Sequence, residues 1–213
     1  MLRQPDSWTE RTTARGLELR PLSAFPPSEE NADPAGVVAA WMRGFLMRPH
    51  PDLGRPGLVC PYVSLSAKAD LVWIATSDAS DEQGIHTLMR AAVRAFEQTP
   101  SPPKQETFKS VLVAFPACVG EIGRRTLKAV QNRLRPESTR RGKMIGLFMP
   151  EAEDEGLFNP HFRPMRAPVP LLAIRSLVEN DAPFVLRNPR LAPIYLWRFP
   201  LTGSLKLAGR LWR

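Results

Sequence analysis

Residues 71–96 read LVWIATSDASDEQGIHTLMRAAVRAF and predict a buried strand followed by an amphipathic helix. Five consecutive apolar residues at 71–75 predict the strand. Ser80 and Asp81 are typical helix caps, and the apolar residues after them recur at the spacing of one helix face. This face comprises Ile85, Leu88, Met89, Ala92, Val93 and Phe96. A strand and a one-sided helix in succession predict a sheet covered by helices.

Strands and helices also alternate on both sides of this stretch. Residues 31–34 supply caps and a first-turn proline for a helix at 35–47, and residues 111–115 predict a second strand. Two more strands are predicted at 144–148 and 171–175. The stripe of a third helix consists of Val119, Ile122, Leu127, Val130 and Leu134, and a basic loop follows it. We therefore expect an α+β domain with a single mixed sheet, flanking helices and long proline-rich loops.

The 23 prolines favour short elements, and no internal repeat is present. Residues 1–33 show no sustained period and predict an irregular N-terminal lead-in without chemistry. Residues 34–203 are expected to form one domain, in which 194–197 make one helical turn or an edge strand. The last residues, 204–213, predict a basic C-terminal tail.

Charge and cysteine content restrict the possible partners and the compartment. The 29 Lys and Arg against 21 Asp and Glu give a net charge of +8, which favours anionic partners or ligands. Two cysteines are too few for a disulfide-stapled secreted module, and the amino terminus lacks the apolar core of a signal peptide. No apolar run is long enough for a membrane helix. We expect a cytoplasmic protein with free thiols and no membrane partner.

Several enzyme classes lack their motifs in this chain. The cysteine spacing does not match a structural zinc site. The sequence contains neither a strand followed by GxGxxG nor a GxxxxGK[ST] loop, and it contains no GxSxG elbow. A Cys–His hydrolase stays possible, because the sequence does not show whether a cysteine meets a histidine in space.

The first candidate segment is the run from His50 to Pro61, which we call the cysteine loop. Its prolines and glycines exclude a regular element, and Cys60 is followed by a proline that fixes the chain direction. An exposed, reactive thiol and a buried one are equally compatible with this pattern, because cysteine is among the most buried residue types. Cys118, at the start of a helical stripe, is expected in the core.

The second candidate segment is the run from Asn159 to Pro168, which we call the arginine loop. Arg163 and Arg166 alternate there with prolines, and fixed guanidinium groups suit carboxylates or phosphates. Alternatively, both neutralise the acidic run at 151–155. Of the three histidines, His50 and His161 lie in these loops, whereas His86 is interpreted as a surface residue of the second helix.

A basic stretch follows the second predicted strand and is opposed only by Glu137. It comprises Arg124, Arg125, Lys128, Arg133, Arg135, Arg140, Arg141 and Lys143. Such a charge density attracts nucleic acid. The stretch contains no aromatic residue for base stacking and no known nucleic-acid motif, so it favours a solvated helix face.

Taken with both loops, the chain resembles DUF6875-type bacterial proteins over residues 40–186. More distantly, it resembles the YqcI/YcgG family, which includes haem-dependent amino-acid N-oxygenases of natural-product pathways. The resemblance is carried by the cysteine loop, the strand around Phe115, Gly146-Leu147-Phe148, and Asn159 to Arg166 followed by Pro168-Val169-Pro170.

This resemblance implies a b-type haem in an apolar pocket formed by side chains such as Trp73, Phe115, Phe148 and Phe162. The implied iron ligand is Cys60, with His161 as the second candidate and His50 as the third. Arg55, Arg163 and Arg166 are the implied clamps of the haem propionates, with Phe162 also in contact with the cofactor.

The implied activity is monooxygenation of a small amine or amino acid by dioxygen. The electrons would come from a separate reductase, because the chain has no flavin or iron–sulfur motif. No catalytic side chain is identified. The alternative is a non-enzymatic binding module whose basic loops hold an anionic ligand or partner, with Cys60 simply buried.

Overall fold

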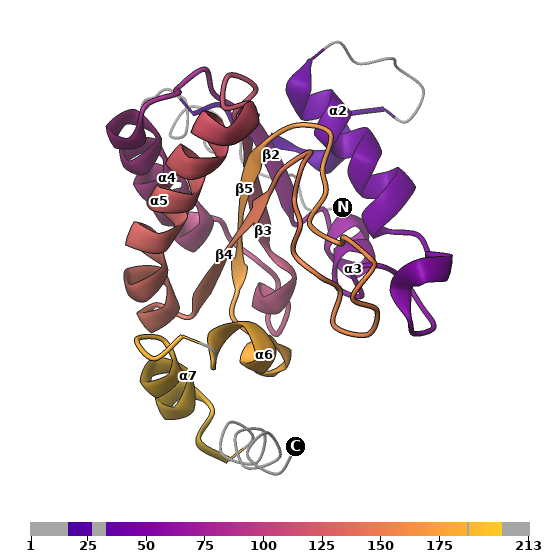
Figure 1. The fold of residues 1–213 in the computed structure, drawn as a ribbon, viewed down its shortest axis with the longest axis vertical. Coiled ribbons are helices and arrows are strands. Elements are labelled where there is room, and N and C mark those ends of the chain that lie inside the picture. The colour runs from indigo at the N-terminus through magenta and orange to yellow at the C-terminus, as the bar shows by residue number, and fades with distance from the viewer. Residues whose placement is uncertain (1–16, 27–32, 187, 202–213) are drawn as a thin grey trace.

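The computed structural model describes residues 17–26, 33–186 and 188–201. Within these residues, five strands form one mixed sheet in the order β1-β2-β3-β5-β4 (Figure 1). The strands are β1 (Arg20–Pro21), β2 (Val72–Thr76), β3 (Ser110–Ala114), β4 (Lys143–Phe148) and β5 (Leu171–Ser176). β2 and β3 are parallel, whereas β1 and β5 run antiparallel to their neighbours. The predicted α+β class with a single mixed sheet is confirmed.

One face of the sheet is covered by α4 (Glu82–Gln98) and α5 (Gly120–Arg140), and we call it the α4/α5 face (Figure 1). The Asp81 side chain caps α4 by accepting from the Gly84 amide at 2.8 Å. All the predicted stripe residues of α4 are buried or pack against this core, since one-sided apolar spacing places them toward the sheet. The strand–helix unit predicted at 71–96 is therefore confirmed.

The prediction for α5 is wrong at both ends of the helix. Val119 and Ile122 are 64% and 83% exposed, because Gly123 is the residue that lies against the backbone of Cys118. A Cβ atom at Gly123 would come within 2.1 Å of the Cys118 carbonyl carbon. At the other end, the helix continues through Pro136 where a basic loop was predicted. Burial of the turn after this proline offsets the missing backbone hydrogen bond.

The opposite face, which we call the α2 face, carries α2 (Pro34–Trp41) and α3 (Val63–Lys68) (Figure 1). A π-helical turn at Met42–Leu46 extends α2, so the predicted helix at 35–47 is present. The chain between β4 and β5 runs along this same side. Short 3-10 turns are found at Leu22–Ala24, Pro51–Leu53, Glu106–Phe108 and Glu179–Asp181.

The lead-in contributes to the folded domain where the structure describes it. β1 pairs with β2, placing Arg20 opposite Ile74. Leu17, Leu22 and Phe25 are each at most 3% exposed. Apolar side chains without a helical or strand period carry no signal in the sequence, yet here they are part of the core.

The chain after β5 adds a third apolar cluster at one end of the sheet. It contains α6 (Ala182–Val185) and α7 (Ala192–Arg198), so residues 194–197 are helical. Tyr195 is fully buried, and its hydroxyl donates to the Glu179 carbonyl at 2.5 Å. The predicted tail at 204–213 lies outside the described residues.

We expect Phe25→Ala to destabilise the domain by about 3–5 kcal/mol, because truncating a buried phenylalanine leaves a cavity. Urea unfolding measures this change. Leu65→Ala, at a position 49% exposed, is the control and should cost much less. Equal effects of the two substitutions would show that residues 17–26 do not stabilise the fold.

Candidate functional site

The cysteine loop and the arginine loop lie against each other. The Asn159 side-chain amide donates to the Asp52 carbonyl at 2.8 Å, across 107 positions of sequence. The ring centroids of His50 and Phe162 are 4.9 Å apart. The two segments singled out from the sequence therefore form one junction on the α2 face.

Behind this junction, five rings form an aromatic cluster. It consists of Trp41, Phe45, His50, Phe148 and Phe162, with successive ring centroids 4.9 to 6.2 Å apart. Phe162 is buried, whereas the other four rings are half-buried. The sequence analysis named His50, Phe148 and Phe162 but missed Trp41 and Phe45, whose spacing indicates only the helix predicted at 35–47.

Gly54 fixes the distance between the two loops. Its φ of +74° is in the left-handed region, and a Cβ there would lie 2.8 Å from the Phe158 carbonyl oxygen. Gly57 also has a positive φ, +95°, but a Cβ there would meet nothing closer than 3.5 Å. Of these two glycines, only Gly54 thus combines the left-handed conformation with a close approach of Phe158, the residue just before the arginine loop.

We expect Gly54→Ala to destabilise the protein more than Gly57→Ala. Both substitutions incur the cost of about 1–2 kcal/mol for a left-handed alanine. Only the first also pushes the arginine loop away. Chemical denaturation of both variants measures the difference. If the two variants are equally stable, the close contact at Gly54 is not a constraint on the junction.

The two loop histidines are poorly placed as iron ligands. His50 Nδ1 accepts from the Asp52 amide at 3.2 Å, so in the neutral ring Nε2 carries the proton instead of a free lone pair. His161 is exposed, and its backbone amide donates to the Asn159 side chain. A haem ligand lies among apolar side chains that surround the cofactor, whereas His161 is exposed.

Cys60 is half-buried and packs against the apolar cluster of the α2 face. Its amide donates to the Leu46 carbonyl at 2.9 Å, which ties the end of the cysteine loop to the π-helical turn. By contrast, Cys118 is buried on the α4/α5 face, where burial raises the pKa of its thiol. The prediction of a core position for Cys118 is confirmed.

Arg175 follows Ala173 by two positions in β5, which places it on the α2 face with Cys60, and it was missed by the sequence analysis. Its guanidinium binds both carboxylate oxygens of Asp181, at 2.7 and 2.5 Å, and this carboxylate is 3% exposed. Burial opposes the charge of Arg175, but the hydrogen bonds that it donates to Asp181 and the negative charge of this carboxylate outweigh burial and raise the pKa of Arg175. In the sequence, Arg175 is only the last residue of a predicted apolar strand, which gives no signal.

The three predicted propionate clamps are engaged with groups of the protein itself. Arg163 and Arg166 both bind Glu153, at 3.2 and 2.6 Å, and lower the pKa of that carboxyl. These ion pairs correspond to the second interpretation given from the sequence, in which both arginines neutralise the acidic run at 151–155. Arg55 donates to carbonyls of its own loop, at 3.0 to 3.2 Å, and lies over the Phe158 ring.

The predicted pocket walls are divided between the two faces of the sheet. Trp73 and Phe115 pack on the α4/α5 face, whereas Phe148 and Phe162 pack on the α2 face. Successive side chains of a strand point to opposite faces of the sheet. Residues on neighbouring strands can therefore lie on different faces and line different pockets. The expectation that all four residues surround one ligand is wrong.

Four of the eight residues in the basic stretch at 124–143 are paired with acidic groups. Glu121 binds Arg124 and Arg125, both at 2.8 Å, and Glu82 lies 3.9 Å from Arg133. Arg141 pairs with two further carboxylates. This pairing supports a solvated helix face over a nucleic-acid surface.

The pKa of Glu121 is lowered to about 2, chiefly by hydrogen bonds from Arg124 and Arg125. A lowered pKa stabilises the folded state above the ordinary pKa of 4.5, and this contribution is lost as the pH falls toward 2. We therefore expect Glu121→Gln to lower the melting temperature at pH 7 and to have no effect near pH 2. A difference that stays constant with pH would contradict this prediction.

Together these features define an α+β domain with a two-loop junction, an aromatic cluster and one half-buried thiol on the same sheet face. The chain belongs to the family described as Domain of unknown function (DUF6875), whose model matches residues 35–207. This confirms the DUF6875 resemblance, while the one to YqcI/YcgG stays a prediction. Comparisons with curated proteins and with solved structures gave no match.

Two further properties concern the described residues only. No helix among them is both long and apolar enough to span a membrane. They also contain no group of three or more His, Cys, Asp or Glu side chains that could hold a metal ion. A haem site requires no such group, because one axial side chain suffices.

Proposed function

We propose that the chain is a haem-dependent monooxygenase that binds its cofactor on the α2 face, with Cys60 as the iron ligand. The observation that carries the proposal is a half-buried thiol that packs against the same apolar cluster as seven other half-buried apolar side chains. These side chains are Trp41, Phe45, Met47, Ala67, Phe148, Val169 and Ala173. Partly covered apolar surface of this kind is what a flat apolar cofactor would bury.

The donor set on this face fits a thiolate-ligated haem. A thiolate sulfur donates electron density to haem iron, and Cys60 is the cysteine that lies on this face. Cys60 is therefore preferred to His161, which is exposed, and to His50, whose Nδ1 is already an acceptor.

A thiolate-ligated haem supplies electron density that favours cleavage of the O–O bond of dioxygen. In the overall reaction, one oxygen atom is inserted into a small amine or amino acid and the other leaves as water, with two electrons and two protons consumed. The electrons come from a separate reductase. The protein's own contribution is to hold the ligand sulfur and to exclude water with the aromatic cluster.

The test is the absorption spectrum of the full chain purified from haem-supplemented cells. We expect a Soret band, and a carbon-monoxide difference spectrum of the reduced protein that is typical of thiolate ligation. Cys60→Ser should abolish this thiolate signature, because serine has no comparable affinity for iron. Cys118→Ser is the matched control, since Cys118 is buried on the opposite face of the sheet.

Circular dichroism of both variants establishes that they are folded. A thiolate spectrum that survives Cys60→Ser would refute Cys60 as the ligand, and His161→Ala and His50→Ala would then be compared. A colourless protein that also fails to take up added haemin would refute the oxygenase proposal. That result would favour the alternative, a non-enzymatic binding module.

A further inference from the structure

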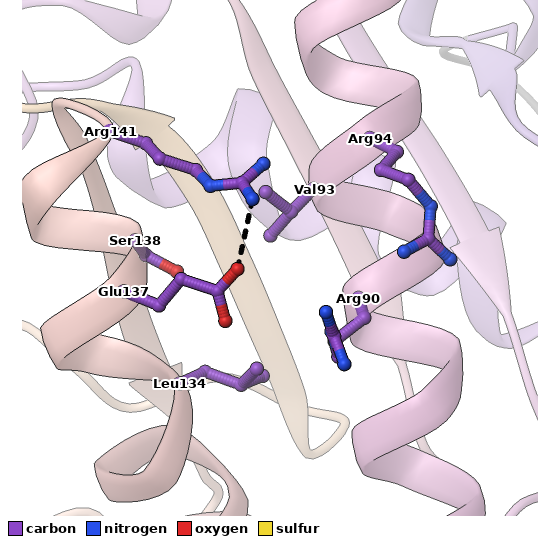
Figure 2. A pocket seen from close by; sticks show the side chains of 7 residues that line it. All are labelled: Arg90, Val93, Arg94, Leu134, Glu137, Ser138 and Arg141. Atoms are coloured by element: carbon purple, nitrogen blue, oxygen red, sulfur yellow. Dashed lines mark ion pairs between the residues drawn. The ribbon is translucent and has the colours of Figure 1, made fainter.

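A small cavity of about 50 Å³ lies between α4 and α5, on the side of the sheet opposite the α2 face (Figure 2). Arg90 and Arg94 line it from α4, and Arg141, the residue that follows the end of α5, also lines it. Val93 and Leu134 supply its apolar wall. Three guanidinium groups from these two segments therefore line a space large enough for one small chemical group.

The guanidinium groups differ in how they are neutralised. Arg141 binds Glu137 at 3.0 Å, as Figure 2 shows, and Glu97 at 3.3 Å. Arg90 and Arg94 have no ion pair with any of residues 17–26, 33–186 and 188–201. They are four positions apart, so they project from the same side of α4. The positive charge that remains is thus concentrated on the α4 side.

Arg94 carries the strongest sign of a missing partner. Its Nε is buried and has no hydrogen-bond partner in the described part of the chain. A buried donor without an acceptor is costly, and it would be satisfied by an oxygen atom entering the cavity. The sequence analysis did not single out Arg90 or Arg94, because on a helical wheel they belong to an ordinary polar face.

The electrostatic potential is also positive at His86, which lies one helical turn before Arg90 in α4. Burial lowers the pKa of His86, and the positive charges of Arg133 and Arg90 lower it further. Glu137 and Glu82 act in the opposite direction but do not reverse the effect. The arginines therefore dominate the carboxylates on this side of α4.

We propose that this cavity binds a phosphate group, either as inorganic phosphate or as part of a small phosphomonoester. Three guanidinium forks, two from α4 and one from the residue that follows α5, match the several oxygen atoms of a tetrahedral anion better than the two oxygen atoms of a planar carboxylate. The volume of about 50 Å³ admits one such group and leaves the rest of a phosphomonoester outside. This site is separate from Cys60 and does not depend on the proposed haem.

The test is isothermal titration of the full chain with inorganic phosphate at constant ionic strength. We expect saturable binding of one phosphate, weakened roughly tenfold by Arg94→Gln and by Arg90→Gln, since each removes hydrogen bonds to a charged group. Arg140→Gln removes the same charge from an exposed position of α5 and should leave the affinity unchanged within about twofold. Glu137→Gln should tighten binding, because it removes the carboxylate that lines the cavity.

Two further titrations define the ligand class. Glycerol phosphate should bind as well as inorganic phosphate if the cavity takes phosphomonoesters, whereas stronger binding of inorganic phosphate assigns the free ion. Acetate at the same ionic strength should bind more weakly than either. Equal binding of acetate, no phosphate binding, or phosphate binding unaffected by both α4 substitutions would overturn the proposal.

Discussion

The position of β5 between β3 and β4 is the constraint on which the rest of the structure depends. Because β5 pairs on both edges, its residues must alternate strictly between the two covered faces. Leu172 and Ile174 enter the α4/α5 core, whereas Arg175 is left on the side of Cys60. The chain that returns from β4 to β5 must also cross the α2 face, and this brings the arginine loop against the cysteine loop.

Short-range sequence patterns predicted most of the helices and strands, because each pattern depends only on residues close together in the sequence. The stripe of α4 and its Asp81 cap are complete within one stretch of sequence. The same reasoning fails where tertiary contacts determine which side chains are buried. Ile122 fits a helical stripe but is exposed because Gly123 takes the place against Cys118. Phe25 has no period at all, yet it is fully buried. Neither fact can be read from a window of the sequence.

The candidate site could be predicted at the level of segments but not of partners. The two proline-rich loops that were singled out as candidates do meet. The guanidinium groups within them bind carbonyls of their own loops and a carboxylate of the preceding acidic run, and a sequence does not show whether Arg166 faces Glu153 or a ligand. Arg175 was missed for the opposite reason, since a charge inside an apolar strand becomes informative only once Asp181 is seen beside it.

The brevity of β1 has a consequence for how the molecule behaves in concentrated solution. β2 would be an open edge of the sheet without it, and a row of unpaired amides and carbonyls invites strands of other molecules to add. Two residues, Arg20 and Pro21, cover part of that edge, and Pro21 has no amide to offer an incoming strand. Removal of the residues up to this point would leave the edge of β2 unpaired and promote aggregation, even though the α2 face would be unchanged.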